Sequence, residues 1–321
     1  MKKNRKTFLV TGGTGFIGSN ICGLLVNKNY RVKIFDNNSR GSLSKIKKIK
    51  KKIKFIKGDI RNQKLLNKAF KNTDAVIHLA YVNGTGNFYK EPVKILDIAV
   101  KGILNVLDGC IKNNIKELYL ASSSEVYQTP EKIPTDEEEP LKIPDIYNPR
   151  YSYGGGKILT ELMGVHYGKI FFNKLVIFRP HNVYGPNMGH DHVIPEFINR
   201  FIKMKKKDNK FEIKGSGNET RSFIFIDDFV SAFDLILKKG KHLNIYNIGT
   251  DEEIKISHLA FKISKFFNKK IILHKTTIVK GSAKHRCPNI LKITKLGFKQ
   301  RCSLNLGLYK TIDWYKKAYN K

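Results

Sequence analysis

The segment VTGGTGFIGSN, residues 10–20, constrains the fold of this chain more than any other feature of its sequence. A short apolar run leads into it, and an apolar-periodic segment follows it. Gly13, Gly15 and Gly18 fit the pattern G-x-G-x-x-G, and Gly12, Gly15 and Gly18 fit G-x-x-G-x-x-G. Glycine permits a tight turn and lets the backbone at a helix N-terminus approach a pyrophosphate. We therefore predict a strand, a phosphate-binding turn and a helix in this segment.

A carboxylate follows at the distance that a dinucleotide requires. The next apolar run ends at Asp36, 18 residues after Gly18. A carboxylate at the end of a second strand accepts hydrogen bonds from ribose hydroxyls and repels a 2′-phosphate, so it favours NAD over NADP. Arg40 would weaken that preference, although the segment NNSRG around it is also typical of a polar loop.

Strand-like runs alternate with helical patterns along the first 180 residues. This alternation predicts an α/β fold, a Rossmann-type doubly wound parallel sheet, with a smaller interleaved C-terminal region. Residues 1–180 form the predicted NAD-binding domain and residues 181–321 the smaller region, from which a strand near 244–249 rejoins the main sheet. The predicted strands are 7–11, 31–35, 54–58, 75–80, 117–122 and 175–180, and the predicted helices are 16–27, 93–113, 152–172, 194–206, 227–238, 256–267 and 304–319.

The positive charge is spread along the chain. The 321 residues have a formal net charge of +33, and only KIKKIKKKIKF at 45–55 is a dense basic run. Isoleucine at every third or fourth position there favours a helix with a solvated face over a nucleic-acid contact. The sequence contains no run of about 18 apolar residues, so it predicts no membrane span. We expect a protein that binds neither nucleic acid nor membrane.

The cysteines give no sign of a metal centre. Cys22, Cys110, Cys287 and Cys302 are widely separated and form no CxxC pair. Reduced thiols in a cytoplasmic protein are therefore expected, with no metal site and no disulfide framework.

The segment YSYGGGK, residues 151–157, combines three glycines that destabilise a helix with two reactive side chains. Three glycines in a helix cost about 2–3 kcal/mol relative to alanine. Tyr153 and Lys157 are four residues apart and share one helix face. A neighbouring ammonium lowers the pKa of a phenol, so Tyr153 is predicted to take a proton from a sugar hydroxyl while hydride leaves the same carbon. We expect the glycines to allow close packing and to leave room for the cofactor, or to serve a contact between subunits.

Several segments together carry a family resemblance. TGGTGFIGS, Asp36, GDIRN, HLA, ASSSEVYQTP, YSYGGGK and RPHNVYGP occur in the order and at about the spacing of the extended short-chain dehydrogenase/reductase family. The chain thus resembles its NAD-dependent nucleotide-sugar epimerases, dehydratases and decarboxylases. The resemblance implies bound NAD, a nucleotide-diphosphate sugar as substrate, a nucleotide-sugar-binding C-terminal region and a homodimer built on the helices at 93–113 and 152–172.

The resemblance also implies site residues. Ser123 hydrogen-bonds the reacting hydroxyl, Tyr153 is the base and Lys157 tunes it. For the cofactor it implies a pair that flanks adenine (Asp59 and Ile60), a turn beside phosphates and ribose (Leu79, Ala80 and Tyr81), and Gly12, Gly15, Phe16, Ile17, Asp36, Asn37, Tyr153, Lys157 and Pro180. For the substrate it implies Ser124, Asn182 and the arginine clamp Arg221 and Arg286 at the diphosphate, with Val193 and Ile213 near the base. Two positions depart from the family pattern: Ala99 stands where many members have asparagine, and Gln128 replaces a common glycine.

Glu125 bears on the reaction type. All branches of the family begin by oxidising the sugar at C4, and dehydratases place a glutamate two residues after the position of Ser123 to remove the C5 proton. HRCPNI around Arg286 also resembles UDP-glucuronate decarboxylases. We expect C4 oxidation followed by a lyase step, either 4,6-dehydration or decarboxylation, with Glu125 as a catalytic residue. The alternatives are a 4-epimerase, a simple C4 dehydrogenase and a non-catalytic NAD-sensing scaffold.

Overall fold

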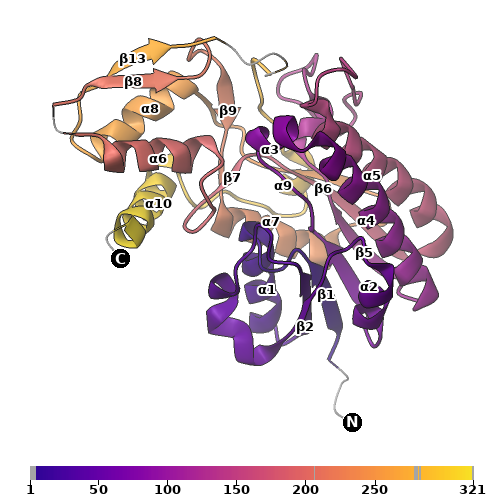
Figure 1. The fold of residues 1–321 in the computed structure, drawn as a ribbon. Helices are drawn as coiled ribbons and strands as arrows, with labels where there is room; N and C mark the ends of the chain where they lie inside the picture. The colour runs from indigo at the N-terminus through magenta and orange to yellow at the C-terminus, as the bar shows by residue number, and fades with distance from the viewer. Residues whose placement is uncertain (1–4, 206, 278–280, 282, 320–321) are drawn as a thin grey trace.

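Seven parallel strands form one central sheet (Figure 1). The computed structural model describes residues 5–205, 207–277, 281 and 283–319. The strand order is β11-β6-β5-β4-β1-β2-β3, so the direction of winding reverses between β1 and β4. The strands are β1 (Thr7–Thr11), β2 (Arg31–Asp36), β3 (Ile53–Lys57), β4 (Ala75–His78), β5 (Glu117–Ala121), β6 (Lys174–Pro180) and β11 (Ile245–Ile248). In such sheets ligands bind beyond the carboxyl ends of the strands at this reversal.

Helices cover both faces of the sheet. Along β1, Leu9 packs into one hydrophobic core and Val10 into the other, because successive side chains of a strand point to opposite faces. One layer consists of α2 (Gln63–Phe70), α4 (Pro92–Lys112) and α5 (Tyr151–Phe171), with the short α3 (Thr85–Lys90) beside them. The other layer consists of α1 (Phe16–Asn27), the 3₁₀ helix η1 (Leu43–Lys52) and α7 (Ile226–Lys239). The sheet is therefore buried on both faces, as parallel sheets require.

The rest of the chain forms a smaller body beyond the carboxyl ends of the strands, at the upper left of Figure 1. Its helices are α6 (Val193–Lys203), α8 (Ile256–Lys265) and α10 (Leu304–Tyr319), whereas the short α9 (Leu291–Thr294) packs against β11 and α7. Its strand pairs are β7 (Val183–Tyr184) with β10 (Ile224–Phe225), β9 (Thr220–Ser222) with β12 (Glu253–Lys255), and β8 (Lys210–Ile213) with β13 (Ile272–Lys275). Between this body and the sheet lies the 3₁₀ helix η2 (Ser124–Tyr127). The segment from α7 to β11 returns to the main sheet, where β11 pairs with β6.

The predicted α/β class with a doubly wound parallel sheet is confirmed, and two local expectations need correction. The basic run 45–55 does not form one helix: η1 ends at Lys52 and β3 begins at Ile53. Of its isoleucines only Ile46 is fully buried, so little packing opposes the repulsion among the lysines. The pair β8–β13 was not predicted, because its strands are distant in sequence.

Within the described ranges, no helix is long and apolar enough to cross a membrane. All four cysteines are free and buried. Burial raises the pKa of the Cys22, Cys110, Cys287 and Cys302 thiols, so these groups remain protonated.

Candidate functional site

A cavity of about 760 Å³ separates the sheet from the C-terminal body. It is lined by the glycine turn, the ends of β2 to β5, the N-terminal part of α5 and the segments around 182–197 and 214–223. Every predicted site residue except Ile213 lines it. The side chain of Ile213 is 1% exposed in the hydrophobic core, and the adjacent Lys214 lines the cavity instead. The expectation that Ile213 borders the base is thus not supported, because β8 turns this side chain inward.

The glycine turn leaves backbone exposed where a phosphate needs it. Gly12 has a φ of +74°, and a Cβ there would lie 2.7 Å from the backbone nitrogen of Ala80. A Cβ on Gly18 would lie 2.1 Å from the carbonyl oxygen of Gly12. Gly15 is the N-cap of α1, so no side chain caps the first N–H groups of that helix, and its first turn has no acidic residue. These N–H groups and the positive end of the helix dipole fit a pyrophosphate.

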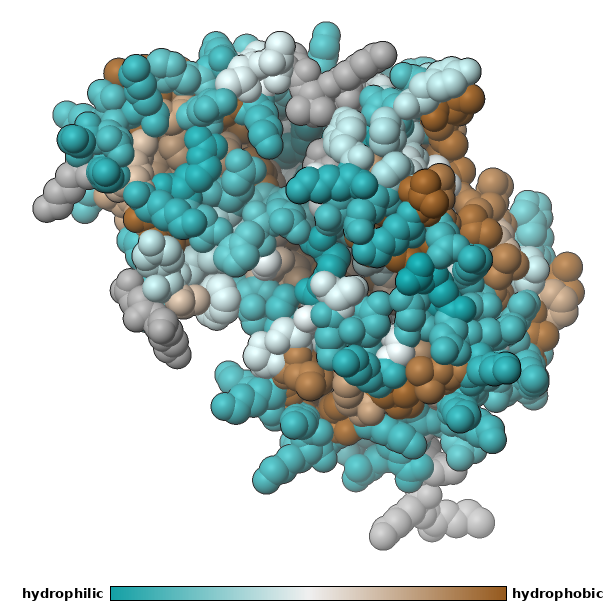
Figure 2. All heavy atoms as spheres, in the orientation of Figure 1, coloured by the Kyte–Doolittle hydropathy of each residue, from teal (hydrophilic) through white to brown (hydrophobic). Residues whose placement is uncertain are grey.

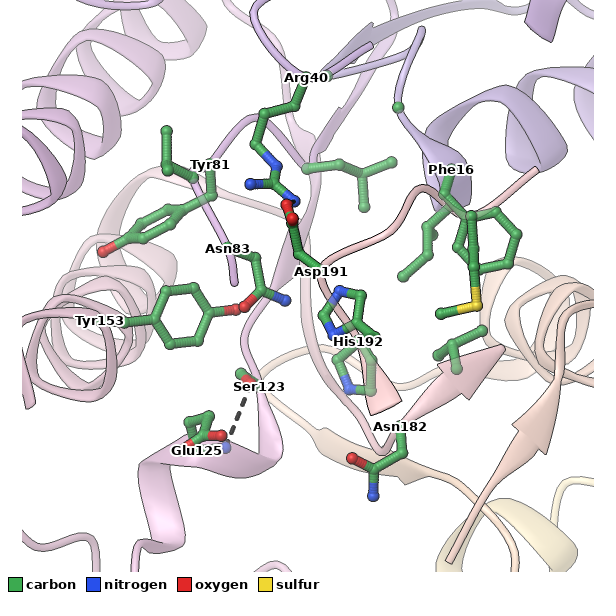
Figure 3. A pocket seen from close by; sticks show the side chains of 18 of the residues that line it. Phe16, Arg40, Tyr81, Asn83, Ser123, Glu125, Tyr153, Asn182, Asp191 and His192 are labelled. Atoms are coloured by element: carbon green, nitrogen blue, oxygen red, sulfur yellow. Dashed lines mark hydrogen bonds and ion pairs between the residues drawn. The ribbon is translucent and has the colours of Figure 1, made fainter. Parts of the chain in front are cut away.

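Asp36 fixes the turn and faces the same cavity. Its two carboxylate oxygens accept hydrogen bonds from the backbone N–H groups of Thr14 (2.9 Å) and Asn38 (2.8 Å). Each oxygen has a second acceptor site, which fits a ribose diol. Arg40 is turned toward another partner: its Nη2 is 2.9 Å from Asp191 Oδ2, across the cavity mouth (Figure 3).

Asp59 is the second carboxylate on the cofactor side. Hydrogen bonds from Arg61 outweigh partial burial and, with one from Asn37, hold the pKa of Asp59 at about 2. Arg61 is in turn 2.8 Å from Asp97 on α4. The cavity wall that carries Asp59 and Ile60 is therefore fixed by an ion-pair network, and the residues of this side fit NAD.

Tyr153 is packed between two aromatic rings and directed into the cavity. Its ring stacks on Phe88 with centroids 4.8 Å apart and meets the edge of Tyr81 at 5.2 Å. In Figure 3 its hydroxyl points toward Ser123, which precedes η2 and accepts a hydrogen bond from the backbone N–H of Glu125 at 3.1 Å. Packing of this kind holds the phenol in one direction.

The prediction that Lys157 lowers the pKa of Tyr153 is wrong for the folded protein. Burial raises the pKa of Tyr153 to about 12. A hydrogen bond with Ser123 and the charges of Arg286 and Arg40 oppose this effect without overcoming it. Burial also lowers the pKa of Lys157 to about 7, so near neutral pH Tyr153 is protonated and Lys157 is only partly charged. Desolvation outweighs attraction between the two, a balance that spacing in a sequence does not reveal.

Lys157 lies on the predicted helix face but contacts other groups. Its Nζ donates a hydrogen bond to the carbonyl oxygen of Ala121 at 2.7 Å. The same atom is 4.0 Å from the centroid of the Tyr81 ring and 6.0 Å from that of Tyr153. Tyr81, predicted only as part of a turn beside the cofactor, therefore bridges the catalytic pair.

The three glycines serve packing and do not border the cavity. A Cβ on Gly154 would lie 2.1 Å from Gln128 Nε2, and one on Gly156 would lie 2.1 Å from the Tyr81 hydroxyl. Gly155 faces Ile143 and has more room, 3.2 Å to the nearest atom. The expected close approach is present, but none of the three lines the cavity. The expectation that they leave room for the cofactor is therefore wrong, because Gly154 faces Gln128 after η2, Gly155 faces Ile143, and Gly156 faces Tyr81 and α4.

Glu125 belongs to a cluster of arginines. Its carboxylate lies 2.6 Å and 3.1 Å from the two terminal nitrogens of Arg286, and 3.6 Å from Arg150. Burial raises the pKa of Glu125, but the charges of Arg286 and Arg150 outweigh it and hold that pKa at about 2. Burial and Arg286 also lower the pKa of Arg221 to about 10. Three guanidinium groups with one carboxylate leave this wall positive, which suits an anionic substrate.

The remaining substrate-side residues lie as follows. Asn182 has a φ of +38° and donates a hydrogen bond from Nδ2 to the carbonyl oxygen of Ser222 at 2.8 Å. Val193 begins α6 at the cavity wall. Sequence reasoning missed Arg150 and His192, which also line the cavity. Arg150 is one helical turn before Tyr153, a spacing that could have revealed it.

One cavity combines a dinucleotide-binding turn, a buried Tyr–Lys pair and a second, cationic wall. This combination is typical of a short-chain dehydrogenase/reductase with an extended substrate region. The chain belongs to the NAD dependent epimerase/dehydratase family, whose model matches residues 8–249. It is 31% identical to a dTDP-D-glucose 4,6-dehydratase of Dictyostelium discoideum, over 97% of this chain and 82% of that one. It is 34% identical to a putative UDP-glucose 4-epimerase of Methanocaldococcus jannaschii, over 96% and 98%.

The solved structures agree with this assignment. A UDP-glucose 4-epimerase of Thermotoga maritima, determined with UDP-glucose, superimposes with a TM-score of 0.88 at 25% identity, over 98% of this chain and 99% of that one. The protein is therefore an NAD-dependent enzyme of the epimerase/dehydratase family.

Proposed function

We propose that the enzyme oxidises a nucleotide-diphosphate sugar at C4. The observation that carries this proposal is that one cavity is lined by the glycine turn, by Ser123 and Tyr153, and by the arginine cluster. NAD⁺, when bound, accepts the hydride of the oxidised carbon and can return it. Ser123 orients the C4 hydroxyl, and Tyr153 takes its proton. Arg40 and Arg286, which lower the pKa of Tyr153, make its deprotonation easier.

The cationic wall is the proposed diphosphate site. Arg221 and Arg286 present forked donors that match phosphate oxygens in geometry and charge. Asn182 lines the same cavity. Relatives of this chain are described as acting on dTDP-D-glucose and UDP-glucose, which supports a pyrimidine nucleotide sugar as substrate.

For the second step we propose a lyase reaction in which Glu125 removes the C5 proton of the 4-keto sugar. The position of Glu125 in the cavity, two residues after Ser123, supports this role. A 4-epimerase is the second candidate, and the contacts of Glu125 favour it. A carboxylate held by Arg286 and Arg150, with a pKa of about 2, is a poor base until its partners move to the substrate.

The test is incubation with a panel of UDP-, GDP-, dTDP- and CDP-sugars, with NADH absorbance and product mass as readouts. Loss of water indicates dehydration, loss of CO₂ decarboxylation, and an unchanged mass epimerisation, which NMR identifies. In the lyase case, Glu125→Gln accumulates NADH and stops before product. A variant that turns over at the wild-type rate contradicts the lyase role. A panel in which no sugar gives either a product or transient bound NADH contradicts C4 oxidation.

We further propose that the enzyme is a homodimer formed through α4 and α5. Figure 2 shows apolar side chains along the edge where these helices lie in Figure 1. Val93 is 79% exposed and Ile170 is 74% exposed, which is costly for isolated apolar side chains that nothing covers. The other exposed apolar residues of the two helices are Leu96, Val100, Leu162 and Phe171. A second copy related by a two-fold axis would bury both patches at once.

Sedimentation of matched variants tests the dimer. Leu162→Glu places a charge in the proposed interface and is expected to yield monomers. Leu291→Glu is the control, because Leu291 is at least as exposed as Leu162 but lies on α9. A wild-type monomer at micromolar concentration contradicts the proposal.

A further inference from the structure

Tyr81 lies between the catalytic pair and α4. It follows β4, and its ring meets that of Tyr153 edge to face, with an interplanar angle of 89°. Lys157 Nζ lies over the face of the Tyr81 ring, 4.0 Å from the centroid. In Figure 3 the two phenol groups point in opposite directions: the Tyr153 hydroxyl toward the cavity, the Tyr81 hydroxyl away from it. The ring of Tyr81, and not its hydroxyl, therefore faces the catalytic pair.

The surrounding helices are shaped to accept this ring. The Tyr81 hydroxyl is buried and has no hydrogen-bond partner among the described residues. It occupies the place that a side chain at Gly156 would take, and Ala99 lies 2.7 Å from the same position. Two small residues on neighbouring helices thus admit a ring whose polar end gains no hydrogen bond. A buried hydroxyl without a partner costs free energy, so the ring itself is expected to supply the benefit.

We propose that Tyr81 is a positioning residue that holds the Lys157 ammonium against the face of its ring and keeps it charged beside Tyr153. The electron-rich face of an aromatic ring attracts a cation, most strongly where water is excluded. The ring has one advantage over a carboxylate: it stabilises the ammonium without accepting its proton. The carbonyl oxygen of Ala121, at 2.7 Å, then fixes the direction of the same group.

The other titratable groups around Lys157 supply little compensating charge. Glu161, one turn further along α5, raises the pKa of Lys157, but its carboxylate is bound by Arg179 of β6 at 2.6 Å and 2.8 Å. His78 of β4 is buried, and burial together with Lys157 lowers its pKa to about 3, so it stays neutral. Glu161 is bound by Arg179 and His78 is neutral, whereas the face of the Tyr81 ring is directed at the Lys157 ammonium and favours its charged form.

A double-mutant cycle at two pH values tests this inference and needs no substrate. Tyr81→Leu and Lys157→Met are combined, and unfolding by urea is measured at pH 6, where Lys157 is charged, and at pH 9, where it is neutral in the fold. We expect a coupling of about 30-fold in the unfolding equilibrium constant at pH 6 and none at pH 9. A coupling that is absent, or equal at both pH values, overturns the proposal, because it indicates packing alone.

Ring electronics provide a second measurement if Tyr81→Leu does not fold. Fluorinated phenylalanines at position 81 keep the shape of the ring and withdraw its electron density. The coupling at pH 6 is expected to fall with each added fluorine, and a coupling that does not change contradicts the proposal. Tyr81→Phe, which keeps the ring face, should retain the coupling.

The effect of Tyr81 on the pH dependence of turnover rests on the proposed function, in which Lys157 acts beside Tyr153. In Tyr81→Leu the alkaline limb of the turnover profile should move down by about one pH unit, and Tyr81→Phe should restore it. Phe88→Leu is the matched control, because Phe88 packs on Tyr153 and forms no described contact with Lys157. It should lower turnover without moving the limb. If no nucleotide sugar is turned over, the unfolding cycle still decides the role of Tyr81.

Discussion

The two sides of the cavity are built in different ways. On the cofactor side, backbone geometry defines the site: a glycine turn, the free end of α1 and the carboxylate of Asp36, whose oxygens bind backbone N–H groups. On the substrate side, side-chain charges define it. Glu125, Arg150, Arg221 and Arg286 come from four separate segments and meet only in the fold.

This difference separates what each side tolerates. Backbone geometry admits one residue type at a position, because a Cβ at Gly12 or Gly18 meets neighbouring backbone. A charge cluster tolerates exchange of its members provided that the net charge persists. The cofactor side is therefore expected to fail abruptly on mutation and the substrate side by degrees.

The largest effect is expected at the point where the two sides meet. Tyr153→Phe keeps the ring that packs on Phe88 and removes the phenol oxygen that, once deprotonated, accepts the sugar proton. Loss of a general base costs about 10²- to 10⁴-fold in turnover. Product formation with a saturating nucleotide sugar measures the loss, and NAD content measures whether the cofactor side is intact. Tyr147→Phe is the control, because Tyr147 is 90% exposed in the same region. Equal losses in both variants would separate Tyr153 from the chemistry.

A smaller effect is expected from Asp36→Asn. The amide has one oxygen where the carboxylate has two, so one of the N–H groups of Thr14 and Asn38 loses its acceptor. Hydrogen bonds to charged groups contribute about 1.5–3 kcal/mol each, so NAD binding should weaken by about 10- to 100-fold. Calorimetry with NAD measures this change. An increase of KM for the sugar without a change in NAD affinity would place Asp36 on the wrong side of the comparison.

How much was predictable follows the same division. Asp36 and the glycine turn could be placed from sequence, since strand, turn and helix are consecutive and parallel strands end at one edge. Tyr153 and Lys157 were placed on the correct helix face, but their pKa values were not, because burial is a property of the whole fold. The bond between Glu125 and Arg286 joins residues 161 positions apart, and the inward side chain of Ile213 depends on a strand that pairs with distant β13.

On the substrate side, Arg286→Gln should have a moderate effect. It removes one of three guanidinium groups, while Arg150 and Arg221 keep the wall positive. We expect KM for the nucleotide sugar to rise by about tenfold, with NAD affinity unchanged. Steady-state kinetics at low and moderate salt measure it. A loss of NAD binding in this variant would contradict the separation of the two sides.

Lys157 links stability to pH with a defined sign. Its pKa is lowered in the fold to about 7, against about 10.5 in the unfolded chain, so the unfolded state binds more protons between these values. The free energy of unfolding should therefore rise with pH from about 7 to 10.5, by at most about 1.4 kcal/mol per pH unit from this group. Lys157→Met removes this contribution. The difference in free energy of unfolding between wild type and variant therefore separates the effect of Lys157 from the effect of the other lysines, which lose their charge in the same pH range. A difference in free energy of unfolding that stays constant from about pH 7 to 10.5 would contradict a lowered pKa of Lys157 in the fold.

Three single-alanine variants sharpen the comparison further, because α5 supports both sides. Gly154 packs on Gln128 under the loop of Glu125, and Gly156 packs on Tyr81 beneath Lys157, while Gly155 faces only Ile143. Alanine favours a helix by about 1 kcal/mol over glycine, so Gly155→Ala should stabilise the protein by up to that amount.

The flanking positions should reverse this gain to different degrees. At Gly154 the nearest obstacle is the buried Gln128 amide, which is hydrogen-bonded to the carbonyl oxygen of Glu125, so Gly154→Ala should displace this amide and raise KM for the sugar through the Glu125 loop. At Gly156 the obstacles are a wedged tyrosine and Ala99 on α4, so Gly156→Ala should destabilise by about 1–3 kcal/mol and lower turnover more than it raises KM. Urea unfolding and steady-state kinetics of the three variants measure both quantities. Equal changes in stability and in kinetics for all three variants would contradict this prediction. They would mean that Gly154 does not specifically support the substrate side and that Gly156 does not specifically support Tyr81 and Lys157.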